Sequence, residues 1–75
     1  MVVVIFGDDT EQILRDLPKP ARDEVGDLVK ALRGCPAEWP ARDGMECAWS
    51  FGRRSWVLYV VHANIIEVLD IGWTG

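Results

Sequence analysis

Three side chains with useful chemistry lie at the two ends of one predicted strand. Arg53 and Arg54 come directly before an apolar run, residues 55–62, and His62 closes that run. Guanidinium groups bind phosphate or carboxylate through a fork of N–H donors, and an imidazole changes charge near neutral pH. A strand rises about 3.3 Å per residue, which places His62 about 20–25 Å from the arginines. The two ends of this strand therefore cannot act on one phosphate.

Carboxylates and thiols offer weaker signals. Glu67 and Asp70 lie in the last apolar segment, where a carboxylate normally pairs with an arginine or reaches a sheet edge; a catalytic carboxylate pair is the alternative. Cys35 and Cys47 form no CxxC pair, and the chain has one histidine. Because a zinc site and a disulfide framework both need more ligands or cysteines, we expect no metal and no cofactor.

Size and charge limit the possible classes of protein. The chain has 75 residues and is 49% hydrophobic, which predicts one domain over residues 1–75 with a thin core that favours assembly with a partner. Eight basic and twelve acidic residues give a net charge of −4, the wrong sign for holding a nucleic acid by bulk electrostatics. The apolar segment at residues 1–6 is too short for a signal peptide, and no segment reaches the length of a membrane span. We expect a cytoplasmic protein.

The first half of the chain predicts a strand and two helices. Residues 2–6 are β-branched or aromatic, as in a strand buried on both faces. Asp8 and Glu11 form a capping-box pattern before a helix that ends near residue 16. A second helix is expected over residues 20–33, with Gly34 as a left-handed C-terminal cap. Its buried side should contain the apolar residues at helical spacing, Val25, Leu28, Val29 and Leu32.

The second half predicts three antiparallel strands after a loop at residues 35–44, in which Trp39 is expected to anchor packing. The strands should cover residues 45–51, 55–62 and 65–72. The alternation in the first of them predicts one buried face, consisting of Met45, Cys47, Trp49 and Phe51. The whole order, β-α-α-β-β-β, predicts an α+β fold of two layers, with a helical hairpin packed on one face of a mainly antiparallel sheet.

The register of the central hairpin decides which aromatic side chains reach the surface. If Gly52 to Arg54 form a three-residue connection, Trp49 faces Val57 on the helix side of the sheet. Three apolar residues then point away from the helices, where a partner would cover them: Trp56, Leu58 and Val60. A slip of one residue would instead put Trp56 in the core. Trp73, after the last strand, is either a lid on the core or part of the same interface.

Three segments in this order resemble the RelE/ParE superfamily of bacterial toxins. They are Asp16-Leu17-Pro18-Lys19-Pro20-Ala21-Arg22 before the second helix, Trp56-Val57-Leu58-Tyr59 in the third strand, and Val68-Leu69-Asp70-Ile71-Gly72 in the last. The resemblance covers most of the chain. It implies the same α+β fold and a toxin that an antitoxin polypeptide neutralises by wrapping around it.

The resemblance also implies where catalytic residues would lie. Members that cleave mRNA on the ribosome surround the scissile phosphate with basic side chains, at positions that correspond here to Ala48, Ser50, Trp56 and Trp73. Cleavage through the 2′-hydroxyl needs a proton acceptor, a proton donor and cations for the developing charge. None of these four residues supplies them.

Two hypotheses of different classes follow. The first is a RelE/ParE-like toxin that binds an antitoxin; if it is an enzyme, it is a metal-independent, ribosome-dependent mRNA endonuclease that uses Arg53, Arg54 and Arg42. The second is a non-catalytic interaction module on the same scaffold: a decayed toxin, a ParE-type inhibitor or a homodimeric regulator. In both, the partner, an antitoxin or a second copy, would be bound through Trp56, Leu58, Val60 and Trp73. Neither hypothesis requires a membrane or a small-molecule cofactor.

Overall fold

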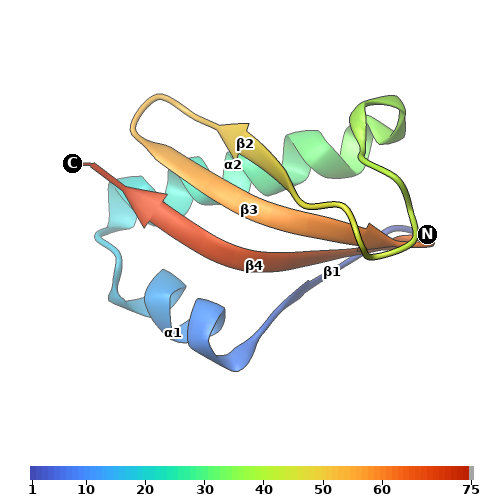
Figure 1. Cartoon of the computed structure of the whole chain (residues 1–75). Coiled ribbons are helices and arrows are strands. Elements are labelled where there is room, and N and C mark those ends of the chain that lie inside the picture. The colour runs from blue at the N-terminus through green and yellow to red at the C-terminus, as the bar shows by residue number, and fades with distance from the viewer. Residues whose placement is uncertain (75) are drawn as a thin grey trace.

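The computed structural model describes residues 1–74 and confirms the predicted α+β fold. The elements follow the order β1 (Val3–Phe6), α1 (Asp8–Asp16), α2 (Lys19–Gly34), a 3-10 turn η1 (Pro36–Glu38), β2 (Ala48–Phe51), β3 (Ser55–His62) and β4 (Ile65–Trp73). The strands form one sheet in the order β1-β4-β3-β2, in which only the β1–β4 pair is parallel. Both helices pack on one side of this sheet, as Figure 1 shows. No helix within residues 1–74 has the length and apolarity to span a bilayer.

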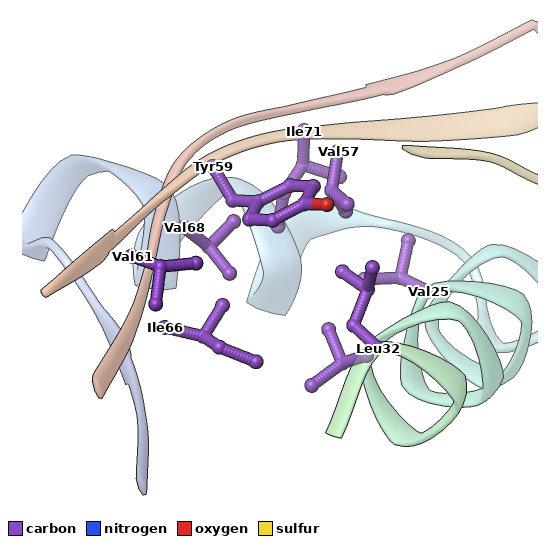
Figure 2. Packing of buried hydrophobic residues seen from close by; sticks show 9 residues of the cluster. Val25, Leu32, Val57, Tyr59, Val61, Ile66, Val68 and Ile71 are labelled. Atoms are coloured by element: carbon purple, nitrogen blue, oxygen red, sulfur yellow. The ribbon is translucent and has the colours of Figure 1, made fainter. Parts of the chain in front are cut away.

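The core lies between α2 and the two central strands. Alternate residues of β3 and β4 point toward the helices, where they meet one stripe of α2. Figure 2 shows Val57 and Tyr59 of the sheet facing Val25 and Leu32 of the helix. The side chains of Val57, Val61, Ile66 and Val68 are fully buried. Trp39 is a packing anchor, because its indole Nε1 donates to the Leu32 carbonyl at 2.7 Å.

Several predicted details of the helices are wrong. Helix α1 begins after Gly7 without a side-chain cap, and Glu11 pairs with Arg15 instead of closing a capping box. Gly34 is the last residue of α2, and Cys35 follows it with a φ of −131°; the helix therefore ends without a left-handed glycine cap. Leu28 is half-buried, whereas Ala21, Val25, Val29 and Leu32 are the buried residues of this helix.

Strand β1 is an edge strand with one open side. Val3 and Ile5 are exposed, while Val4 and Phe6 pack against the core. The sequence predicted burial on both faces because all five residues are apolar. The helices cover only one side of the sheet, and the other side of β1 is left in contact with solvent.

Strand β2 differs most from its prediction. It spans only Ala48–Phe51, and Met45, Cys47, Trp49 and Phe51 are all exposed. The amide of Gly52 donates to the Ser55 carbonyl at 2.8 Å, so the connection has two central residues, Arg53 and Arg54, rather than three. This turn pairs Phe51 with Trp56 and Trp49 with Leu58. Cross-strand partners share a face, and Trp49 and Phe51 therefore lie on the side away from the helices.

Candidate functional site

The Arg53–Arg54 turn is fixed by its backbone, which leaves both side chains exposed. The amide of Arg54 donates to Glu24 Oε1 at 2.8 Å, and its carbonyl accepts from the Thr74 amide at 2.8 Å. These two bonds tie the turn to α2 and to the end of β4. Neither guanidinium group forms an ion pair within the part of the chain that the structure describes.

Arg53 lines a groove together with three acidic residues. The groove lies between α2 and the turn, and its lining includes Asp23, Glu24 and Asp27 together with the apolar side chain of Leu28. Carboxylates close to an arginine compete with phosphate for the same N–H donors and repel a polyanion. The three nearby carboxylates therefore disfavour binding of a nucleic-acid phosphate by Arg53.

Arg42 lies at the opposite end of β3 from the other two arginines. Its carbonyl accepts from the Ala63 amide at 3.1 Å, beside the β3–β4 turn. Its guanidinium carbon lies 4.8 Å from the centre of the Trp39 ring, a cation–π arrangement. Because β3 has eight residues, about 25 Å of strand separates Arg42 from the Arg53–Arg54 turn. The three predicted catalytic arginines do not converge.

His62 shares the end of β3 with Arg42 but faces a carboxylate. Its Nε2 lies 3.4 Å from Glu67 Oε1. A Cβ on Gly44, which has a φ of +77°, would lie 2.0 Å from the imidazole ring, so the ring occupies the space above this glycine. His62 is thus held by Gly44 and Glu67, at the far end of the strand from Arg53 and Arg54.

The positions that the resemblance assigns to cations lie on different sides of the sheet. Ala48 pairs with Tyr59 and Ser50 with Val57, which places both on the helix side. Trp56 lies on the opposite side, against Gly72. Trp73 pairs with Ser55 and, by the alternation along the strand, belongs to the helix side. The four positions therefore do not surround one point.

An exposed aromatic patch is the clearest feature of the uncovered side of the sheet, which we call the open face. We define the patch as Trp49, Phe51, Trp56 and Leu58. Trp49 and Phe51 are 53% and 70% exposed, and their rings are stacked with centroids 6.2 Å apart and planes 20° apart. Trp56 and Leu58 are half-buried beside them.

The other predicted contact residues differ in their access to a partner. Val60 shares the open face but is only 4% exposed, and Trp73 is half-buried on the other side. Beyond the patch, the open face continues with Val3, Ile5 and Ile65, all of which are exposed. A small domain rarely leaves several large apolar side chains uncovered on one face. The open face is therefore the candidate functional site.

Two carboxylates interrupt this apolar face. Glu67 pairs with Val60 across the strands and reaches His62, while Asp70 pairs with Leu58 and is exposed. The expectation that they reach a sheet edge is wrong, because β4 is an inner strand. Asp70 Oδ1 accepts from the Ile71 amide at 2.9 Å. A bulge at Leu69, between the pairs of Leu58 and Tyr59, rotates Asp70 to the open side.

Trp49 and Phe51 belong to this site, although their sequence pattern predicted that they lie on the buried face. Their alternation with Ala48 and Ser50 shows that they share a face, but not which face. The length of the turn between β2 and β3 decides which face they occupy. The turn residues Arg53 and Arg54 include neither the glycine nor the asparagine that marks a two-residue hairpin turn. No local signal in the sequence identifies them.

Comparisons with known proteins identify solved structures of the same fold. No protein-family model matches the sequence, and no curated protein matches it at a significant level. A chain of the intact E. coli RelBE toxin-antitoxin complex superposes with a TM-score of 0.79 and 15% identity, over 100% of this chain and 99% of that one. A variant of the E. coli toxin RelE with two arginines replaced by alanine, in the free state, gives a TM-score of 0.77 and 16% identity, over 96% of this chain and 82% of that one. These superpositions show that the chain has the fold of RelE, as the resemblance noted in the sequence implies.

Proposed function

We propose that this protein is the RelE-like component of a bacterial toxin-antitoxin pair and that it acts by binding polypeptides rather than by cleaving RNA. The observation that carries the proposal is the exposed aromatic patch on the open face of a RelE fold. A similar chain in the RelBE complex supports an antitoxin as the partner.

The chemistry of the open face suits a polypeptide. Trp and Phe side chains anchor many protein interfaces because they bury a large apolar area with few rotatable bonds. Trp49 and Phe51 already stack on each other, so little side-chain entropy is lost when a partner covers them. An amphipathic segment of an antitoxin would place its apolar side on this patch.

The same geometry disfavours RNA cleavage. Positive charge must lie close to the reacting phosphate to stabilise its transition state. Arg42 is about 25 Å from Arg53 and Arg54 along β3, and Arg53 lies beside three carboxylates. The open face itself presents apolar side chains together with Glu67 and Asp70.

Binding can be tested with the polypeptide encoded beside this protein. The two chains would be co-expressed, and their affinity measured after purification. We expect Phe51→Lys to weaken binding at least about tenfold, because it places a charge in the centre of an apolar contact. Gln12→Lys is the matched control: it adds the same charge on α1, away from the open face, and should bind like the wild type. Equal affinity of the two variants would contradict the proposed surface.

Cleavage can be tested on ribosomes stalled on a defined mRNA. We expect the purified protein to cut no more than the double variant Arg53→Ala, Arg54→Ala. Strong cleavage that this double variant loses would replace the proposal with the endonuclease hypothesis. Growth arrest on overproduction, relieved by the adjacent polypeptide, is expected in either case.

A further inference from the structure

The strands of the sheet carry acidic side chains but no basic ones. Across β1, β2, β3 and β4, as the structure describes them, the acidic residues are Glu67 and Asp70, and none is a lysine or an arginine. The eight basic side chains lie instead on the two helices, in the loop before β2 and in the β2–β3 turn. The open face is therefore apolar and negatively charged.

Both carboxylates have apolar neighbours on adjacent strands. Glu67 is the partner of Ile5 on β1 and of Val60 on β3, and Asp70 is the partner of Leu58 in the aromatic patch. Since Leu58 and Val60 are two residues apart on β3, the two acidic residues lie about 7 Å apart along the sheet. A polypeptide that covers Leu58 therefore also meets Asp70.

Asp70 is the acidic residue of this face that the described part of the chain leaves without a cation. No ion pair within residues 1–74 includes it, and its Oδ1 accepts from the Ile71 amide at 2.9 Å. Glu67 Oε1 lies 3.4 Å from His62 Nε2, which supplies a positive charge only when the imidazole is protonated. Covering a carboxylate with apolar atoms removes its hydration, which is unfavourable unless a cation or donor replaces the water. A partner that brings its own cation avoids that penalty.

We propose that the occupant of the open face is a basic amphipathic segment of a polypeptide. Its apolar side chains cover the aromatic patch, and one lysine or arginine pairs with Asp70. A second basic residue about 7 Å from the first reaches Glu67, a spacing close to that of i and i+4 on a helix or i and i+2 on a strand. The inference rests on the proposed binding of a polypeptide to this face, and it adds the chemical class of that polypeptide.

A single-stranded nucleic acid is the other occupant that exposed aromatic side chains could hold, since bases stack on such rings. It would bring phosphates to strands that contain two carboxylates and, within the described residues, no lysine or arginine. Like charges repel, and binding of a phosphate backbone depends on basic side chains. The charge of the open face thus favours a cationic polypeptide over a polyanion.

The test is selection from displayed peptides of about twelve random residues, which are long enough to cross four strands even as a helix. Binders of the wild-type chain are counter-selected against Phe51→Thr, a neutral change that removes part of the aromatic patch. Among the survivors we expect lysine and arginine to outnumber aspartate and glutamate at least about threefold. The same selection on Asp70→Lys should reverse that excess.

The affinity of one synthesised survivor measures how much the charge contributes. Asp70→Asn keeps an acceptor for the Ile71 amide but removes the charge, and we expect it to weaken binding about fivefold; Asp70→Lys should weaken binding at least about twentyfold. Asp16→Lys is the matched control, because it makes the same change of charge at the end of α1, on the helix side of the sheet. It should bind like the wild type. Circular dichroism checks that each variant is folded.

The outcomes separate this inference from the proposed function. Survivors without an excess of basic residues overturn the inference, and so does an affinity that neither change at Asp70 alters or a single-stranded RNA that displaces the peptide. A library without survivors also overturns it, and sedimentation of the chain alone then shows whether a second copy covers the face. In each of these cases, loss of binding of the adjacent polypeptide in Phe51→Lys would still support the proposed function. Binding of basic peptides through Asp70, without any binding of the adjacent polypeptide, would keep the inference and refute the antitoxin as partner.

Discussion

The two faces of one sheet differ in burial although both carry large apolar residues. On the helix side, Val57 and Ile66 have no exposed surface. On the open face, Phe51 is 70% exposed and Trp49 53%. Neighbouring residues of the same strands thus contribute to the core or to a recognition surface, according to the side on which each lies.

The difference shows that apolar character alone does not assign a residue to the core. Two helices of nine and sixteen residues cover one side of four strands, and residues 1–74 form no further layer on the other side. The helix side supplies the stability of the fold. The open face supplies apolar surface for a partner, and substitutions on the two faces should therefore have different consequences.

The largest expected effect comes from two adjacent isoleucines on opposite faces. Ile66 is fully buried, whereas Ile65 is 39% exposed. We expect Ile66→Ala to lower the free energy of unfolding by about 2–5 kcal/mol, through lost apolar burial and the cavity that remains. Ile65→Ala should change it by less than about 1 kcal/mol. Urea unfolding measures both, and equal losses would refute the assignment of the two faces.

A second pair of substitutions tests how Trp56 is held on the open face. A Cβ on Gly72 would lie 1.9 Å from the Trp56 ring, so Gly72→Ala must displace the indole and should cost about 1–3 kcal/mol. Gly26→Ala is the control, because nothing lies within 4 Å of its Cβ position in α2. That change should stabilise the protein by about 0.5–1 kcal/mol. Thermal unfolding would measure the change in stability of both variants, and tryptophan fluorescence would report the displaced indole. An unchanged fluorescence spectrum of Gly72→Ala would contradict the contact between Trp56 and Gly72.

The buried side should also respond to alkaline pH. Burial, and next the nearby charge of Glu38, raise the pKa of Tyr59 above its ordinary value of 10.0. The unfolded chain therefore releases this proton first, and the stability from the neutral phenol is complete below pH 10 and lost as the pH rises through the folded-state pKa. In Tyr59→Phe we expect this part of the pH dependence to disappear. Urea unfolding at a series of alkaline pH values tests it; an identical slope in both proteins would assign the loss to other groups.

The smallest expected effect lies in the turn that joins β3 and β4. Ala63 has a φ of +53°, a conformation that places an L side chain near its own carbonyl oxygen. Ala63→Gly removes this strain and should stabilise the protein by up to about 1 kcal/mol, against the greater entropy that glycine brings to the unfolded state. It should leave partner binding unchanged. A clear destabilisation in thermal unfolding would show that the methyl group contributes packing.

The order of the helices and strands follows from local features of the sequence. Pro18 and Pro20 separate the two helices, since proline interrupts a helix interior but fits its first turn. The spacing of Val25, Val29 and Leu32 correctly indicated the buried side of α2. These features depend on residues close together in the chain, and local geometry is enough to predict them.

The choice of apolar residues that form the open face depends instead on long-range contacts in the fold. Strand β3 is apolar on both sides, so its pattern does not distinguish core from surface, and a change of one residue in the turn moves Trp49 and Phe51 from one side to the other. Hydrogen bonds from Gly52 to Ser55 and from Arg54 to Glu24 set that turn; the second joins residues thirty positions apart. The separation of Arg42 from Arg53 and Arg54 likewise depends on how β2 and the loop before it lie along β3. Long-range pairing, which no local pattern encodes, therefore placed the aromatic patch where a partner can reach it.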